Sequence, residues 1–82
     1  MENPFEEILS AIEELINDNT VPKNIKKKMD ESKKFLLEEN QAPTIRANKA
    51  LSKLDELSEE TNIPAYTRTQ IWNIVSMLET IK

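Results

Sequence analysis

Apolar residues recur at intervals of three and four along four stretches of the chain, which is the pattern of amphipathic α-helices. We expect these helices to span about residues 3–17, 21–39, 43–60 and 64–81. Their expected inner faces are Phe5, Ile8, Leu9, Ile12, Leu15 and Ile16; Ile25, Met29, Ser32, Phe35 and Leu36; Ala47, Ala50, Leu51, Leu54 and Leu57; and Thr67, Ile71, Ile74, Val75, Leu78 and Ile81. With few aromatic residues and no Gly, the pattern predicts an all-α protein.

Proline and asparagine mark the expected helix ends. The prolines, at positions 4, 22, 43 and 64, each stand close to an expected helix start. Asn3 is the expected N-cap of the first helix. Because the chain has no Gly, we expect asparagines to adopt the positive φ that often ends a helix. The asparagines that follow expected helices are Asn19, Asn40 and Asn62.

The second half of the chain resembles the first at an offset of 42 residues. Aligning residues 5–40 with 47–82 without gaps gives six identities. Both halves carry an aliphatic residue followed by proline at the expected corner, at Pro22 and at Pro64. We interpret the repeated unit as an αα-hairpin whose corner is closed by this dipeptide.

Two such hairpins, over about 3–40 and 43–82, predict a single domain that spans residues 1–82. Because short loops favour antiparallel neighbours, we expect a four-helix up-and-down bundle built from the two hairpins. A solenoid of the HEAT type has a similar unit length, but it would need about three or more copies to bury a continuous core.

Composition argues against several classes of function. The chain has no Cys, so disulfides and thiolate metal sites are excluded, and no His, the commonest general base and metal ligand. No nucleophile paired with a base can be named. We therefore expect no enzyme activity, no cofactor, no metal and no small-molecule substrate. Acidic first residues and the lack of an apolar run of about 18 residues predict a cytoplasmic protein without membrane contact.

Charge is unevenly spread over the expected helices, although the net charge is only −4. The first helix carries acidic residues and no basic one, whereas the second is rich in lysine. We favour the interpretation that the two sets complement each other across the first hairpin. The alternative is that the lysines contact the phosphates of a nucleic acid. The candidate phosphate-binding residues are Lys23, Lys26, Lys27, Lys33 and Lys34.

The third expected helix is charged against its dipole, with basic residues near its start and acidic residues near its end. We expect Arg68 to offset this by an ion pair with Glu59 or Glu60, or by hydrogen bonds to the terminal carbonyls. Lys26 stands at the matching place after Asp18 and is expected to act in the same way. A basic external partner is the other candidate.

The fourth expected helix holds the candidate partner-binding residues, which are Tyr66, Arg68 and Trp72. Arg68 and Trp72 are four residues apart and therefore lie on one side of the helix. Trp, Tyr and Arg are the residue types enriched at binding hot spots. We favour the interpretation that Trp72 simply seals the edge of the core, with its N–H reaching water, and the alternative is that Arg68 and Trp72 anchor a partner.

Residues 54–79, LDELSEETNIPAYTRTQIWNIVSMLE, resemble the C-terminal signature of a small archaeal family of short, all-helical proteins, the uncharacterised protein family numbered 0147. The residues that carry the resemblance are Ile63, Pro64, Thr67, Arg68, Thr69, Ile71, Trp72, Ile74, Ser76, Leu78 and Glu79. The stretch IRANKAL at 45–51 is similar to the same family more loosely. The resemblance implies a four-helix bundle from an archaeal cytoplasm, and it brings neither an activity nor a known site.

From these patterns we predict a non-enzymatic protein-interaction module that binds another protein or a second copy of itself. The alternative is a nucleic-acid or ribosome accessory protein that binds phosphates through the lysines of the second helix.

Overall fold

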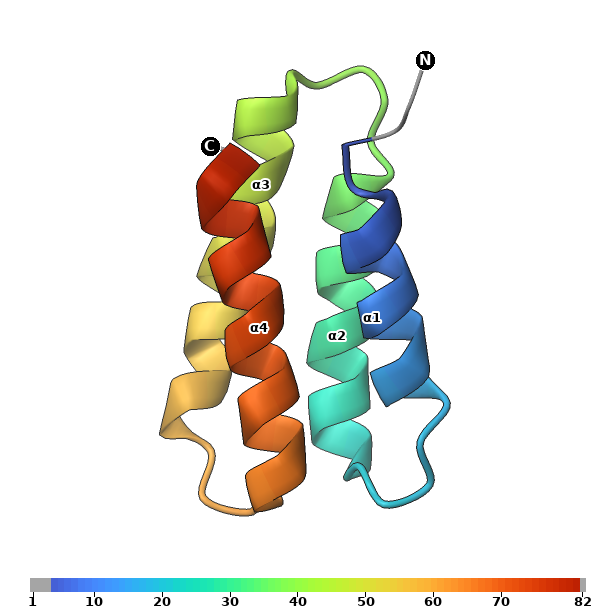
Figure 1. The fold of residues 1–82 in the computed structure, drawn as a ribbon, viewed down its shortest axis with the longest axis vertical. Coiled ribbons are helices and arrows are strands. Elements are labelled where there is room, and N and C mark those ends of the chain that lie inside the picture. Colours follow the sequence, from blue (N-terminus) through green and yellow to red (C-terminus); the bar gives the residue numbers. More distant parts are fainter. Residues whose placement is uncertain (1–3, 82) are drawn as a thin grey trace.

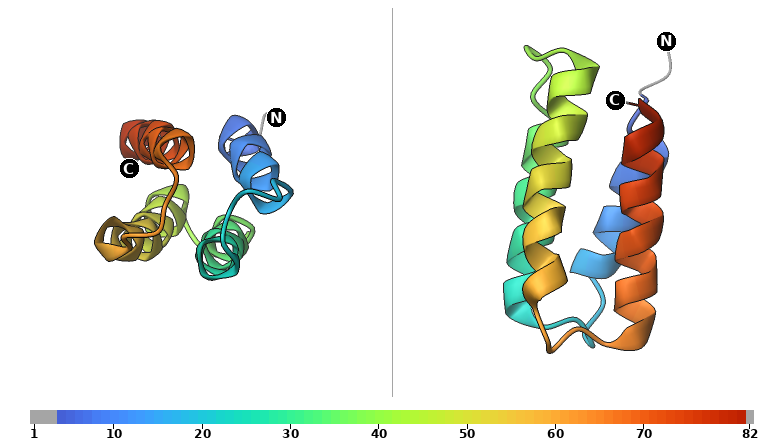
Figure 2. Two further views of the ribbon diagram at one scale, coloured as in Figure 1. Left: turned by 90° about the horizontal axis from the view of Figure 1, so that it is seen from below. Right: turned by 90° about the vertical axis from the view of Figure 1, so that its left-hand side faces the viewer.

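The computed structural model describes residues 4–81, apart from the side chain of Ser58, and that part of the chain contains helices and no strand. The elements are α1 (Glu6–Ile16), α2 (Lys23–Leu36), α3 (Pro43–Asp55), the 3-10 helix η1 (Glu56–Glu59) and α4 (Ala65–Ile81). The α-helices run alternately up and down and occupy the corners of a rough square (Figure 1, Figure 2). The expected all-α four-helix bundle is confirmed.

Each α-helix packs against two neighbours, because α1 also contacts α4 and so closes the square. The most extensive contact joins α2 to α3, which belong to different hairpins. The two hairpins therefore depend on each other for their packing, as expected for a bundle with one shared core.

One apolar core lies between the four helices, and its buried positions recur at an offset of 42 residues. Every buried residue of the first half has a buried counterpart in the second. The pairs are Phe5 and Ala47, Ile8 and Ala50, Ile12 and Leu54, Leu15 and Leu57, Val21 and Ile63, Ile25 and Thr67, Met29 and Ile71, Ser32 and Ile74, and Leu36 and Leu78. The buried positions of the two halves therefore match at the same offset as their sequences. The hairpin repeat itself stays a prediction.

Prolines stand at the helix starts, although α2 begins two residues later than predicted. Pro22 has an extended backbone and precedes the first residue of α2, and its carbonyl accepts hydrogen bonds from the amides of Ile25 and Lys26 at 3.1 Å. Pro43 lies in the first turn of α3, where its missing amide leaves no hydrogen bond unmade. Asn3, the predicted cap of the first helix, lies outside the described residues.

The predicted helix ends at asparagines are wrong. No residue among 4–81 has a positive φ, so Asn19, Asn40 and Asn62 do not adopt the left-handed conformation. Helices α1 and α2 end earlier than predicted, at Ile16 and Leu36. The residue after each helix keeps right-handed backbone angles, and its amide still donates to carbonyls of the preceding turn. Because these bonds satisfy terminal carbonyls, no left-handed residue is needed there.

Candidate functional site: the groove between α3 and α4

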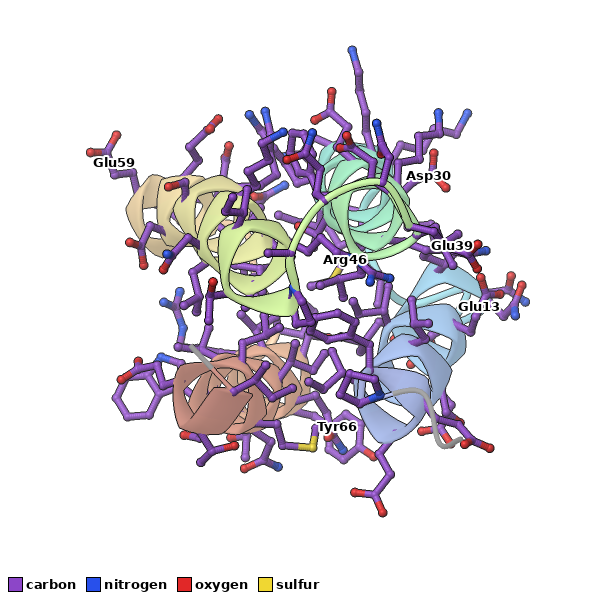
Figure 3. All side chains as sticks on the ribbon, turned by 90° about the horizontal axis from the view of Figure 1, so that it is seen from above. Glu13, Asp30, Glu39, Arg46, Glu59 and Tyr66 are labelled. Carbon is purple, nitrogen blue, oxygen red and sulfur yellow. The ribbon has the colours of Figure 1, made fainter. Side chains whose placement is uncertain are left out.

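Ion pairs join α1, α2, α3 and η1 to one another, but none within residues 4–81 involves α4. The pairs are Lys28–Glu56, Lys33–Glu13, Lys34–Asp30 (3.3 Å), Lys49–Glu38 (3.8 Å), Lys53–Glu31 (3.6 Å) and Lys53–Glu56 (3.5 Å). Figure 3 shows Glu13, Asp30 and Glu59 at the periphery of the bundle, away from the core. The charged surface is therefore concentrated on three of the four helices.

The acidic end of the third helix is offset inside the protein. A hydrogen bond from the ammonium group of Lys28 lowers the pKa of the Glu56 carboxyl and raises the pKa of Lys28. The ammonium group of Lys53 lies on the same carboxyl group. At least one of the acidic residues at this end, Glu56, thus has basic partners within the bundle, so an external basic partner is not required for it.

Some of the candidate phosphate-binding lysines are engaged in ion pairs. Lys33 pairs with Glu13 of α1, whose hydrogen bond raises the pKa of Lys33, and Lys34 pairs with Asp30. The Lys33 contact is the complementarity expected across the first hairpin. Of the five candidates, Lys23, Lys26 and Lys27 make no ion pair with the described residues, so the surface open to phosphates is smaller than the sequence suggested.

Arg46 caps α2 from the neighbouring helix, a contact that the sequence analysis missed. Its Nε donates to the carbonyl of Leu36 at 3.0 Å, and its Nη2 donates to the same oxygen. Its guanidinium carbon also lies 4.8 Å from the centroid of the Phe5 ring. The side chain therefore supplies donors to the last turn of α2, where carbonyls lack helical partners.

Arg46 occupies the same position in its helix as Lys26 and Arg68 do in theirs. Sequence reasoning could have found Arg46 from this shared position. Each amide donates to the carbonyl of the residue four places earlier, which is Pro22, Ala42 or Pro64. A basic residue therefore occupies the same place in the first turn of α2, α3 and α4.

Arg68 and Lys26 meet the expectation for the hairpin corners to different degrees. Arg68 Nη2 donates to the carbonyl of Glu60, just after η1, at 3.4 Å, so the expected bond to a terminal carbonyl is present. For the first corner, hydrogen bonds from the hydroxyl and amide of Thr20 chiefly lower the pKa of Asp18, and the positive charge of Lys26 adds to this effect. Lys26 therefore interacts with its corner through space.

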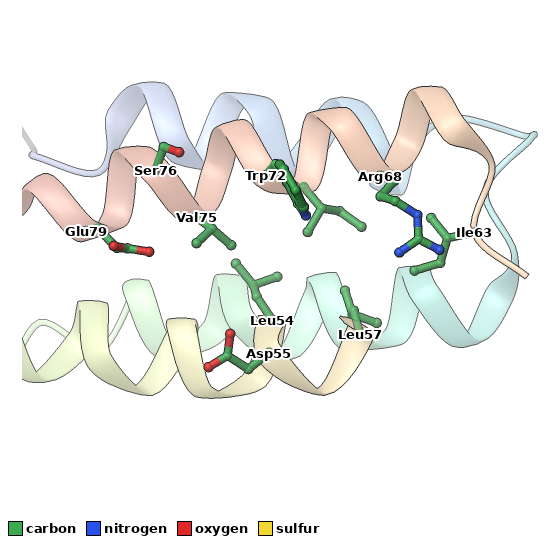
Figure 4. A pocket seen from close by; sticks show the side chains of 10 residues that line it. Leu54, Asp55, Leu57, Ile63, Arg68, Trp72, Val75, Ser76 and Glu79 are labelled. Carbon is green, nitrogen blue, oxygen red and sulfur yellow. The ribbon is translucent and has the colours of Figure 1, made fainter. Parts of the chain in front are cut away.

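The groove between α3 and α4 brings Arg68 and Trp72 together (Figure 4). Its volume is about 280 Å³. One wall is formed by Arg68, Trp72, Val75 and Glu79, hereafter the α4 stripe, and Ile71 lies beside them. The residues that complete the lining are Leu54, Asp55, Leu57, Ile63 and Ser76.

Trp72 does not seal the core, because 71% of its surface is exposed beside this groove. The favoured interpretation of Trp72 as an edge seal is therefore wrong, and the alternative of a partner anchor stays a prediction. Tyr66 is similarly exposed, at 67%, but it lines a different hollow with Leu15 and Asp18, and its hydroxyl accepts a hydrogen bond from Gln70 Nε2 at 2.8 Å. The structure thus joins two of the three candidate partner-binding residues and separates the third.

Helix α4 differs from its neighbours in charge. Within Ala65–Ile81 only Arg68 and Glu79 are charged, whereas eight of the 14 residues of α2 are. Two of the four exposed large hydrophobic residues in the described part of the chain, Tyr66 and Trp72, are on α4. Low charge and exposed aromatic surface are features of the centres of protein interfaces.

Other kinds of site find little support in the part of the chain that the structure describes. Residues 4–81 contain no group of three or more carboxylates placed to hold a metal ion. Within the same residues, none of the helices combines the length and the apolar character needed to span a membrane.

Comparisons with known proteins find one family, whose model matches nearly the whole chain. The family model described as Uncharacterised protein family (UPF0147) matches residues 1–81. The UPF0147 protein MJ1419 of Methanocaldococcus jannaschii is 46% identical over 81 residues, covering 94% of this chain and 87% of that protein. The UPF0147 protein Ta0600 of Thermoplasma acidophilum is 40% identical over 80 residues, covering 98% and 91%.

Two crystal structures share the fold. That of the unknown function protein MMP1188 has a TM-score of 0.93 and 47% identity, and the match covers 96% of this chain and 90% of the other. That of a UPF0147 protein from Thermoplasma acidophilum has a TM-score of 0.90 and 40% identity, covering 98% and 94%. The resemblance first noted in residues 54–79 therefore extends over both hairpins.

Proposed function

Because this chain belongs to the uncharacterised protein family UPF0147, whose name assigns no activity, we propose its function from the site: it is a non-enzymatic protein-interaction module that binds its partner through the α3–α4 groove and the α4 stripe. The observation that carries the proposal is the exposed Trp72 beside an apolar groove, on the least charged helix of the bundle.

Exposure of Trp72 leaves a large apolar surface in water. A Trp side chain of about 200 Å² that is 71% exposed leaves about 140 Å² uncovered. At about 25 cal/mol per Å², covering this surface would contribute about 3.5 kcal/mol before the costs of association. That is the magnitude of a binding hot spot, and hot spots are often Trp or Arg in a pocket that excludes water.

The non-enzymatic part of the proposal is supported by the surroundings of the polar groups. A catalytic residue would need a base, a nucleophile or a perturbed acid aimed into a cleft. Among the described residues, the pKa is shifted at Asp18, Lys28, Lys33 and Glu56 by contacts with other surface residues of the bundle. None of these four residues lines the α3–α4 groove. The cytoplasmic location stays a prediction.

Site-specific photocrosslinking in an extract of the native archaeal host tests the proposal. A photoreactive residue at Ser76, which lines the groove and leaves Trp72 in place, should form adducts with protein that persist after nuclease treatment. The matched control places the same residue at Lys27, which is exposed on α2. Adding Trp72→Ala should remove the adducts at position 76.

The opposite pattern would favour the nucleic-acid or ribosome accessory function. In that case position 27 would form adducts that disappear with nuclease, and position 76 would form none. Binding would also weaken steeply with salt, because phosphate contacts release counterions.

A further inference from the structure

We infer that the partner of the α4 stripe is the same stripe of a second copy of this chain, packed antiparallel across a two-fold axis. The inference rests on the proposed function, because it names the partner of the same surface. It is supported by the spacing of the stripe, by the position of its charges and by the groove beside Trp72.

The spacing of the α4 stripe suits helix pairing. Arg68, Trp72, Val75 and Glu79 follow one another at intervals of four, three and four, which is the spacing of a seam between paired helices. The buried seam of α4 has the same spacing one residue earlier, at Thr67, Ile71, Ile74 and Leu78. Helix α4 therefore carries one seam for the core and, beside it, a second seam that is half-buried or exposed.

The charges of α4 are placed symmetrically about its centre. Arg68 and Glu79 lie at equal distances from the midpoint between Asn73 and Ile74, and they are about 16 Å apart at about 1.5 Å per residue. An antiparallel pair therefore places Arg68 of each copy against Glu79 of the other, which forms two ion pairs. A parallel pair would place like charges together. Because no other residue of α4 is charged, this pattern favours the antiparallel arrangement.

The same register places Trp72 over the groove of the other copy. Trp72 and Val75 lie on either side of the midpoint, so the axis brings Trp72 of one copy against Val75 of the other. In Figure 4 these two residues face Leu54 and Leu57 across the groove. With about 280 Å³, the groove is slightly below the usual range for small-molecule sites, about 300–1,000 Å³, and suits a bulky side chain.

A two-fold contact requires a projecting side chain and, beside it on the same surface, a groove that accepts the same side chain of the other copy. Such an interface uses one patch on both subunits, so the patch must be complementary to itself. A different protein as partner would require neither the symmetric charges nor the adjacent groove. The structure therefore favours a second copy over an unrelated partner.

One face of the bundle is close in area to what a standard interface takes from each partner. The longest and intermediate dimensions of the bundle are 36 and 21 Å, so one face offers roughly 750 Å² in projection. A standard interface takes about 800 Å² from each partner, which is about 15% of the 5295 Å² surface of this chain. A contact of this size falls short of the more than about 2,000 Å² that permanent dimers bury in total, so we expect a reversible dimer, with a dissociation constant in the micromolar range.

Sedimentation equilibrium of the purified full-length chain, from about 1 µM to about 1 mM, tests the inference. The wild type should show a monomer–dimer equilibrium. Trp72→Ala should weaken it at least about tenfold, because it removes the central contact. Tyr66→Ala, which removes an equally exposed aromatic residue from another face of α4, should leave the constant within about twofold.

Charge reversal tests the orientation. Glu79→Arg should weaken the dimer about tenfold, because it places two like charges together at both ends of the contact. Glu39→Arg changes the net charge equally at an exposed residue outside the groove and should have no such effect. The double variant Arg68→Glu with Glu79→Arg should restore most of the affinity. Far-UV circular dichroism of each variant confirms that it folds.

Two results would overturn the inference. One is a wild type that stays monomeric at about 1 mM, and the other is an equal loss in Trp72→Ala and Tyr66→Ala. If the wild type is monomeric while position 76 still forms adducts with another protein, the proposed function holds and the second copy is not the partner. If position 76 forms no protein adducts either, both ideas fail.

Discussion

Arg46 should contribute more to the stability of this bundle than Arg68, although the sequence pattern drew attention to Arg68. Arg46→Met keeps much of the length and the apolar stem of the side chain and removes the guanidinium group. That group donates through Nε and Nη2 to the carbonyl of Leu36 and lies against the ring of Phe5. Arg68 makes one bond to the carbonyl of Glu60, and at 3.4 Å this bond is long.

The expected magnitudes follow from these contacts. A hydrogen bond with a charged partner contributes about 1.5–3 kcal/mol, and an exposed cation–π contact contributes about 0.5–1 kcal/mol. Because Arg46 is half-buried, we expect Arg46→Met to lower the free energy of unfolding by about 2 kcal/mol. For Arg68→Met we expect a loss of about 0.5 kcal/mol. A loss of about 2 kcal/mol would lower the Tm of a chain this short by about 10 °C.

Urea unfolding followed by far-UV circular dichroism measures both losses, as a shift of the midpoint at an unchanged slope. Arg46→Lys is the matched control, because it keeps the charge and loses the planar fork, and its stability should be intermediate. A free energy of unfolding for Arg46→Met within about 0.5 kcal/mol of wild type would refute the cap as a stabilising contact. So would a larger loss in Arg68→Met than in Arg46→Met.

Three further predictions concern the core, the response to pH and metals. Leu54→Ala should cost about 2–5 kcal/mol in urea unfolding, whereas Ser52→Ala at an exposed position of the same helix should cost little. Folding lowers the pKa values of Asp18 and Glu56 from 3.8 and 4.5, so both groups stabilise the fold above these values, and this stabilisation is lost as the pH falls through the folded pKa values. Glu56→Gln should therefore make the free energy of unfolding less dependent on pH below about 4.5. An unchanged acid transition in this variant would contradict the assignment. A chelator should leave the far-UV spectrum unchanged, and a loss of helicity on its addition would reveal a structural metal.

The helices and much of their buried faces could be predicted because periodicity identifies a buried face before any neighbour is known. Burial of Ile12, Leu54 and Ile74 follows directly from that pattern. The helix ends could not be predicted in the same way. The carbonyl of Leu36 is satisfied by Arg46, ten residues later in the chain, and a local rule about Gly and Asn cannot contain such a contact.

The candidate site could be predicted in part. Residue types and a spacing of four were sufficient to join Arg68 to Trp72, and both line the groove. Tyr66 is six residues before Trp72, which corresponds to about 240° around a helix, so its separation from Trp72 could have been inferred from the sequence. The pairing of Lys28 with Glu56 could not, because the sequence does not say which of two neighbouring helices a lysine will face.

The two interpretations of Arg68, as a tie at the hairpin corner and as part of a binding surface, do not exclude each other. A guanidinium group has five N–H donors, and the bond from Nη2 to the Glu60 carbonyl is long. The side chain is only half-buried, and it forms one end of the α4 stripe. The corner bond would fix the position of the guanidinium and so reduce the entropy lost when a carboxylate of a partner pairs with it. A small loss of stability in Arg68→Met is therefore compatible with a binding role. Exchanging the charges of Arg68 and Glu79 separates the two roles, because it should restore dimer affinity only if Arg68 is part of the binding surface.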